Sequence, residues 1–150
     1  MHQGSDMDRE NGVGSAEQRI TAQLRRAGLR PTRQRVALAK LLFAAGDRHV
    51  TAEQLHEEAI LAHVPVSLAT VYNTLHQFTD AGLLKELGVS ASKAFFDTNT
   101  SNHYHYLFED SGRVEDIPAS DVRVMGLPEP PAGTHMSGVD ILVRLTRDKD

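Results

Sequence analysis

The sequence of 150 residues contains no cysteine and no tryptophan, and its aromatic residues are limited to three Tyr and five Phe. The absence of cysteine excludes a disulfide framework, a thiolate metal site and a thiol nucleophile, so any bound metal must be held by His and carboxylate side chains. No apolar run approaches the roughly 20 residues that a membrane-spanning helix requires, and the N-terminus lacks the basic and apolar parts of a signal peptide. We therefore expect a cytoplasmic protein.

Charge is distributed unevenly along the chain, although the formal net charge is only −4. Ser15–Lys93 carries ten Lys and Arg against seven Asp and Glu, whereas Ala94–Asp150 carries five against ten. A basic first half followed by an acidic second half predicts a DNA-binding module joined to a module with another task.

Helical periodicity dominates the first half. Residues 1–14 are rich in Gly, Asp and Asn and predict a disordered tail. Four helices follow, and their predicted ranges are about 16–27, 32–46, 52–63 and 68–82. Their starts are marked by capping boxes at residues 15–18 and 51–54, by Pro31-Thr32 and by Ser67.

The period changes from helical to extended after Gly82. Leu83–Leu87 and Lys93–Asp97 read as strands around a polar loop at Gly88–Ser92, which predicts a β-hairpin. Helices followed by such a hairpin make a winged helix-turn-helix, here over residues 15–97.

The second half contains short strands. After a polar hinge at residues 98–102, strands are predicted at 104–108, 113–117 and 139–145, and Pro128–Pro131 excludes a helix between them. So small a unit is marginal as a monomer, so we expect residues 103–150 to dimerise. The predicted class is α+β, with an N-terminal winged helix-turn-helix followed by a small C-terminal α/β dimerisation and sensing domain.

The segment at residues 66–84 has two distinct helical faces. One face is apolar, with Leu68, Val71, Leu75 and Phe78. The other carries hydroxyl and amide groups, from Thr70, Tyr72, Asn73, Thr74 and Gln77. Such a face suits phosphate and base-edge contact in a DNA groove, and Lys93 on the wing could lie along a phosphate backbone. A solvated, Thr-rich helix is an equal alternative on this segment alone.

His103-Tyr104-His105 is the second motif with a candidate chemical role. In a strand, residues i and i+2 share a face, so the two imidazoles point one way while Tyr104 and Tyr106 point the other. Two such histidines form half of a metal site. The alternative is a pair of half-exposed strand histidines without a ligand.

Four sequence strings resemble the ferric uptake regulator family. They are RPTRQR at Arg30–Arg35, HVTAEQL at His49–Leu55, SLATVYNTL at Ser67–Leu75 and DAGLL at Asp80–Leu84. Longer strings, including VPVSLATVYNTL, FFDTNTSNHYHY and VDILVRL, resemble the iron response regulator (Irr) branch of alphaproteobacteria. The resemblance runs from about Ala22 to Arg147.

This resemblance implies a transcription regulator, not an enzyme. It would bind a palindromic double-stranded DNA operator as a homodimer or higher homo-oligomer, regulate iron homeostasis and haem biosynthesis genes, and respond to haem. The DNA contacts that it implies are Arg30, Arg33, Arg35, Ser67, Ala69, Thr70, Tyr72 and Asn73.

The resemblance also implies a divalent metal site for Fe, Mn or Zn. Its ligands would be His49, Asp97, His103, His105 and one acid after the hairpin, Asp116 or alternatively Glu115. The family's other metal site lacks its usual ligands, because Asn102 and Tyr104 stand at two of its positions. A haem contact would use His103, Tyr104 and His105, where Tyr104 replaces the middle one of three successive histidines.

Two alternative functions remain open. A regulator of the same fold could sense zinc, manganese or peroxide instead of haem. An enzyme built on His103 and His105 is disfavoured, because no H-E-x-x-H motif or second histidine pair supplies the rest of a catalytic site.

Overall fold

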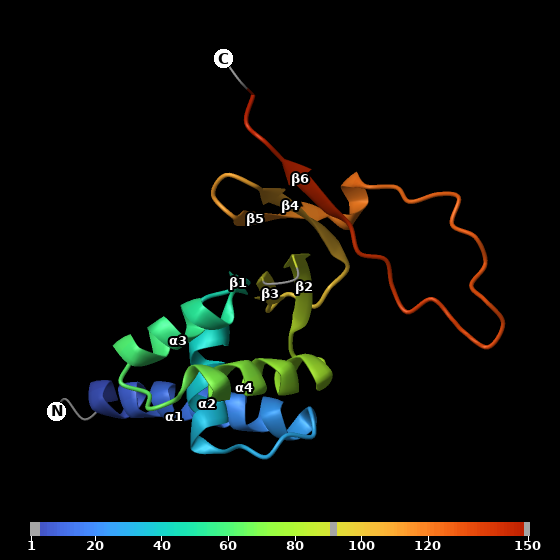
Figure 1. Cartoon of the computed structure of the whole chain (residues 1–150). Helices are drawn as coiled ribbons and strands as arrows, with labels where there is room; N and C mark the ends of the chain where they lie inside the picture. Colours follow the sequence, from blue (N-terminus) through green and yellow to red (C-terminus); the bar gives the residue numbers. More distant parts are fainter. Residues whose placement is uncertain (1–3, 91–92, 149–150) are drawn as a thin grey trace. The chain divides into compact units, whose positions relative to one another are not determined.

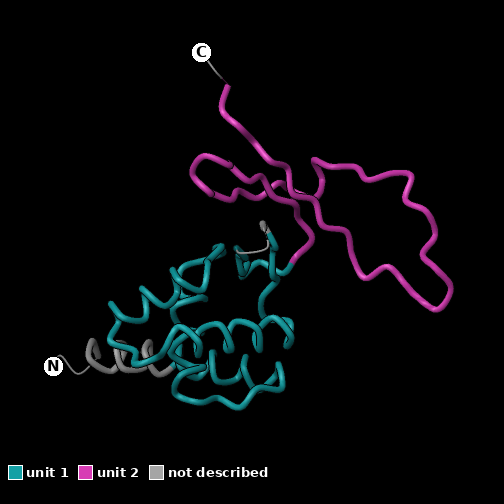
Figure 2. Tube along the Cα trace, in the orientation of Figure 1, with its two compact units in different colours: residues 1–100 teal, residues 101–150 magenta. Residues whose placement is uncertain are grey.

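The computed structural model describes the backbone of residues 4–90 and 93–148, and the side chains of residues 15–88 and 93–148. The chain divides into two compact units, residues 1–100 and 101–150 (Figure 2). This boundary falls inside the hinge that the sequence predicts at residues 98–102.

Four α-helices build most of the first unit. They are α1 (Gly4–Arg26), α2 (Arg33–Phe43), α3 (Ala52–Leu61) and α4 (Leu68–Asp80). Helix α2 packs against α1 and α3, and α3 packs against α4 (Figure 1). Their shared core is apolar and fully buried, with Leu24, Leu38, Leu42, Leu55, Val71, Leu75 and Phe78 at its centre.

The predicted caps of the last three of these helices are confirmed. Thr32 and Ser67 each accept a hydrogen bond from a backbone N–H three residues on, at 3.2 and 3.1 Å. Thr51 and Gln54 form a complete capping box. These side chains satisfy N–H groups that have no partner within the helix.

The start of the first helix was predicted wrongly. Helix α1 begins at Gly4, where the sequence predicted a disordered tail and a capped start at Ser15. No proline interrupts residues 4–26, so each residue there can continue a helix, and a low apolar content does not prevent this. Residues 1–3 of the predicted tail lie outside the described residues.

Helix α4 differs from the prediction at two side chains. Leu68, predicted to face inward, is 36% exposed, whereas Thr74, predicted to face outward, is only 5% exposed. At 3.6 residues per turn Thr74 lies between Val71 and Phe78 on the buried face. Leu68 lies in the first turn of the helix.

A three-stranded antiparallel sheet completes the first unit. The wing strands are β2 (Lys85–Ser90) and β3 (Lys93–Asp97), and β1 (His49–Val50) pairs with the other edge of β3. The sequence predicted the hairpin but not β1, since two residues are too few for a strand pattern. Strand β2 continues to Ser90, into the predicted loop; residues 91 and 92 of that loop lie outside the described residues.

The second unit is a three-stranded sheet of order β5-β4-β6. Strand β4 (His103–Phe108) pairs antiparallel with β5 (Arg113–Pro118) and parallel with β6 (Leu142–Leu145). The only helical piece among described residues 101–148 is a 3-10 turn at Ala119–Asp121. A long loop over residues 122–141 then leads to β6 (Figure 1), which is shorter than predicted.

The α+β class with an N-terminal winged helix-turn-helix is confirmed. Within the described residues, no helix has both the length and the apolar character needed to cross a membrane.

Candidate functional site

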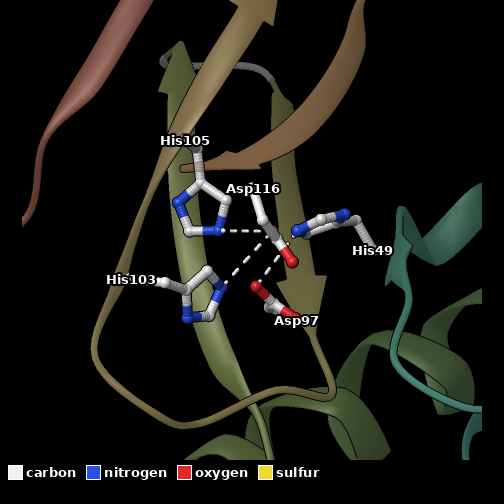
Figure 3. Close-up of side chains that lie close together, drawn as sticks. All are labelled: His49, Asp97, His103, His105 and Asp116. Atoms are coloured by element: carbon white, nitrogen blue, oxygen red, sulfur yellow. Dashed lines mark ion pairs between the residues drawn. The ribbon is translucent and has the colours of Figure 1, made fainter. Parts of the chain in front are cut away.

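In the first unit, β1 and β3 bring a histidine and an acid together. His49 and Asp97 are direct partners in the antiparallel register, and His49 Nε2 lies 3.1 Å from Asp97 Oδ2 (Figure 3). The Asp97 side chain is 1% exposed, and its other oxygen accepts a hydrogen bond from Asn99 N–H at 2.9 Å. A carboxylate buried this deeply needs cationic or hydrogen-bonding partners. This pair is a candidate half-site with two ligands for a metal ion.

Arg48 supports the strand that carries His49. Its guanidinium makes two hydrogen bonds to the carboxylate of Glu58 on α3, at 2.8 and 2.6 Å, and a third to the Leu41 carbonyl at 3.1 Å. Its backbone N–H donates to Thr98 Oγ1 at 2.9 Å, and its carbonyl accepts from Thr98 N–H at 3.0 Å. The hydrogen bonds that Arg48 donates to the Glu58 carboxylate raise the pKa of Arg48, which stays charged. These contacts fix β1 against α3.

In the second unit, β4 presents two histidines on one face. Burial alternates along the strand, with His103, His105 and Leu107 buried and Tyr104 and Tyr106 half-buried. The predicted alternation is therefore confirmed. Because Tyr104 lies on the opposite face of the strand, it cannot ligate an iron that the two histidines hold.

The hydrogen bonding of His103 defines which ring nitrogen carries the proton. Its Nδ1 lies 2.7 Å from the Ser101 carbonyl oxygen, which can only accept, so Nδ1 carries the proton. In the neutral ring, Nε2 then has the lone pair that a metal requires. A second bond of this kind is how proteins orient metal-binding imidazoles.

Asp116 on β5 completes a three-ligand group. It is the direct register partner of His105, and its Oδ1 lies 3.5 Å from His105 Nε2 and 3.4 Å from His103 Nε2 (Figure 3). One ligand atom from each of these residues lies within 4.8 Å of the others. Glu115, the alternative acid, is paired with Arg113 at 2.9 Å and opposes Tyr106. The hairpin thus brings together His103, His105 and Asp116, the predicted ligands of this unit, and does not place the alternative acid Glu115 among them.

Four of the predicted DNA contacts, Arg35, Ser67, Thr70 and Asn73, fall on a surface formed by α2 and α4. A shallow polar pocket is lined by Thr32, Gln34, Arg35, Thr70, Asn73, Thr74 and Gln77. Ser67 joins it through a 2.9 Å hydrogen bond between its hydroxyl and that of Thr70. Ala69 is exposed in the first turn of α4. Polar side chains and a helix N-terminus at one surface suit a phosphate backbone.

The three predicted arginines have different surroundings. Arg35 donates to Gln77 Oε1 from Nε and Nη2, at 3.3 and 3.1 Å, and to the Arg30 carbonyl from Nη1 at 2.8 Å. It therefore braces α2 against α4 and has two N–H groups left for a phosphate. Arg30 is exposed next to it, whereas Arg33 lines a separate pocket with Glu17 and Lys40.

Tyr72 is held by a residue that the sequence did not single out. Its hydroxyl donates a 2.6 Å hydrogen bond to Glu53 Oε1 in the first turn of α3. This bond lowers the pKa of Glu53, and the nearby charge of Lys93 lowers it further. It also raises the pKa of Tyr72. No local sequence pattern predicts this contact, because Glu53 and Tyr72 are 19 positions apart in the sequence.

The chain matches the ferric uptake regulator family over residues 26–127. The chain belongs to the ferric uptake regulator family. Members of this family are transcription regulators and not enzymes, which agrees with the expectation that the chain has no catalytic role.

Individual members of the ferric uptake regulator family resemble the chain at different levels. The peroxide-responsive repressor PerR of Staphylococcus aureus is 40% identical over 96 residues, which are 64% of either chain. The chain thus spans just under two thirds of the length of this relative.

Two solved structures of ferric uptake regulators share the fold. One, from Pseudomonas aeruginosa with manganese, has a TM-score of 0.68 and 27% identity over 87% of this chain and 98% of its own. Another, from Vibrio cholerae, has a TM-score of 0.67 and 23% identity over 85% and 98% of the two chains.

Proposed function

We propose that the protein is a metal-responsive transcription regulator whose operator affinity is set by one divalent ion. The ligands of that ion are His49, Asp97, His103, His105 and Asp116. The observation that carries this proposal is the group of His103, His105 and Asp116 on the β4–β5 hairpin, in which both Nε2 atoms lie within 3.5 Å of Asp116 Oδ1.

The two half-sites complement each other in number and chemistry. The first supplies one imidazole and one carboxylate, and the second supplies two imidazoles and one carboxylate. Only five residues separate Asp97 from His103 along the chain, so one ion can recruit both sets. Occupancy would then restrict the motion of the DNA-binding unit relative to the second unit, a change that favours one state of the regulator.

The donor set favours ferrous iron, manganese or zinc. Imidazole and carboxylate ligands suit these ions, and the absence of cysteine disfavours copper(I). The P. aeruginosa relative was solved with manganese. We propose iron as the physiological ion, which titration of the purified protein with Fe(II), Mn(II) and Zn(II) tests. Operator binding that Mn(II) or Zn(II) induces and Fe(II) does not would refute the choice of iron.

Operator binding uses the α2 and α4 surface and the wing. The proposed contacts are Arg30, Arg33, Arg35, Ser67, Ala69, Thr70, Tyr72, Asn73 and Lys93. A dimer would place two copies of α4 on a palindromic operator, in the manner of helix-turn-helix proteins. Several arginines displace counterions, so affinity should fall steeply as salt rises.

We propose haem as the signal, and genes of iron homeostasis and haem biosynthesis as the targets. The two imidazoles of β4 would hold the haem iron, and Tyr104 on the opposite face of the strand would not. Haem and a divalent ion would then compete for His103 and His105. A haem titration that gives no Soret shift, or a shift that zinc does not suppress, would remove haem from the proposal.

Peroxide is the alternative signal. It is favoured by the 40% identity to the peroxide-responsive repressor PerR of S. aureus. In this case the bound Fe(II) would be oxidised while held by the histidines. Loss of operator binding after peroxide treatment of the Fe(II) form, but not of the Mn(II) form, would favour this signal over haem.

Two pairs of variants test the division of labour between DNA and metal binding. Replacing Tyr72 and Asn73 by Ala should abolish operator binding and leave zinc affinity unchanged, and replacing His103 and His105 by Ala should abolish zinc binding. If each double variant loses both operator binding and zinc binding, the proposal is refuted. Asp116→Asn should weaken zinc binding, while Glu115→Gln, a change of the same kind one residue away, should not.

A further inference from the structure

One acid lies beside predicted DNA contacts from two different elements. Glu53 accepts a 2.6 Å hydrogen bond from the hydroxyl of Tyr72 on α4, and the positive charge of Lys93 on β3 lowers the pKa of Glu53. Glu53 is exposed and Tyr72 is half-buried, with its ring packed against the core. Because the hydrogen bond lowers the pKa of Glu53 and raises that of Tyr72, the carboxylate is ionised and the phenol keeps its proton at neutral pH.

We propose that Glu53 is a specificity-determining residue, which makes the Tyr72 hydroxyl a hydrogen-bond acceptor toward DNA. The inference rests on the proposed DNA-binding function. A phenol has one proton. When that proton is donated to Glu53, the oxygen can still accept a bond but can no longer donate one to DNA.

This restriction selects among the groups that DNA presents. Phosphate oxygens, the guanine N7 and O6 atoms and the thymine O4 atom are acceptors, so they cannot pair with the bound hydroxyl. The adenine N6 and cytosine N4 amino groups are donors and can. Glu53 therefore directs Tyr72 away from the phosphate backbone and toward amino groups of base edges.

The charge of Glu53 acts in the same direction. Non-specific binding depends almost entirely on phosphate contacts, and a carboxylate beside Tyr72 and Lys93 repels phosphates. Specificity is the difference between the affinities for specific and non-specific DNA. A group that weakens non-specific binding therefore raises specificity. An acid on an otherwise basic or neutral contact surface thus has a defined function.

The test measures the affinity of the full chain for two duplexes at fixed salt and metal. One duplex is selected from a random pool by the wild-type chain, and the other is a random sequence of the same length. Glu53→Ala should strengthen binding to the random duplex and reduce the ratio of selected to random affinity by about tenfold, the worth of one hydrogen bond to a charged group. Adding Tyr72→Phe to Glu53→Ala should remove part of the gain on random DNA, because the freed hydroxyl is lost.

Glu57→Ala is the matched control. Glu57 is exposed on the same helix, one turn further along, and its loss changes the net charge equally. If Glu57→Ala reduces the affinity ratio as much as Glu53→Ala, the effect is net charge alone and the inference is overturned. An unchanged ratio in Glu53→Ala also overturns it.

A different result would refute the proposed DNA-binding function itself. A wild-type chain that selects no sequence from the pool refutes sequence-specific DNA binding, and the inference falls with it. A wild-type preference that Glu53→Ala leaves intact refutes the inference alone.

Discussion

The ion pair between Arg48 and Glu58 should contribute measurably to stability, because it is bidentate and sheltered. Its two hydrogen bonds are 2.8 and 2.6 Å long, and the two side chains are 29% and 34% exposed. Bidentate, charge-assisted pairs are stronger than neutral hydrogen bonds. The pair also holds β1, the strand on which the proposed ligand His49 lies.

The expected magnitude lies between two known limits. Exposed ion pairs contribute about 0.2–1 kcal/mol, and hydrogen bonds to charged groups contribute about 1.5–3 kcal/mol. With roughly a third of each side chain in solvent, screening reduces the upper value. We expect a coupling energy of about 1–2 kcal/mol, or about five- to thirtyfold in the folding equilibrium.

A double-mutant cycle measures this coupling. Arg48→Met, Glu58→Ala and the double variant would be unfolded in urea, and the coupling is the non-additive part of the free energy of unfolding. The cycle removes the separate loss of the Arg48 bond to the Leu41 carbonyl, since this loss occurs in both variants that lack the guanidinium.

The pair between Lys40 and Glu17 is the control for exposure. Its side chains are 38% and 55% exposed, so its coupling should be below about 0.5 kcal/mol and should decrease in 0.5 M salt, roughly the range in which surface pairs are screened. Equal couplings for the two pairs, or a value below about 0.3 kcal/mol for Arg48 and Glu58, would refute the reasoning from burial.

Three further predictions concern stability and titration. His63 has a positive φ of 57°, so His63→Gly should raise the free energy of unfolding by about 1 kcal/mol while His63→Ala should not, as measured by urea unfolding. Phe78 is fully buried, so Phe78→Ala should cost about 3–5 kcal/mol in the same assay, whereas Leu61→Ala, at a side chain that is 76% exposed, should cost little. Because the hydrogen bond to Glu53 raises the pKa of Tyr72, its stabilising effect is present below the ordinary tyrosine pKa near 10 and is lost as pH rises through the higher value in the folded protein. An absorbance titration should show one of the three tyrosines ionising at lower pH after Glu53→Ala, and an unchanged curve would contradict this.

Features with local signals could be predicted from the sequence. The Thr51 capping box and the Ser67 cap depend on residues three positions apart, and the structure contains both. The alternation of His103, Tyr104 and His105 follows from the geometry of one strand. The strand β3 was predicted with its observed bounds, since Lys93–Asp97 combines a turn before it with an aromatic pair.

Features that depend on distant residues could not be predicted from sequence patterns. Strand β1 pairs with the edge of β3, which no local pattern reveals, so the sequence placed His49 before a helix and predicted no strand there. The contact of Tyr72 with Glu53 requires the packing of α3 on α4. The choice of Asp116 over Glu115 depends on the register of β5, where a shift of one residue would exchange their faces.

The parallel pairing of β4 with β6 has a consequence for the order of folding. In that pairing His105 opposes Leu142, so a chain segment of more than thirty residues must close into a loop before the contact forms. Closing such a loop costs conformational entropy and slows folding. The β4–β5 hairpin has only a short turn between its strands, so it forms sooner, and it carries His103, His105 and Asp116. We therefore expect the three proposed metal ligands to be assembled on the nascent hairpin before β6 joins the sheet, so that an ion present during synthesis can stabilise this intermediate.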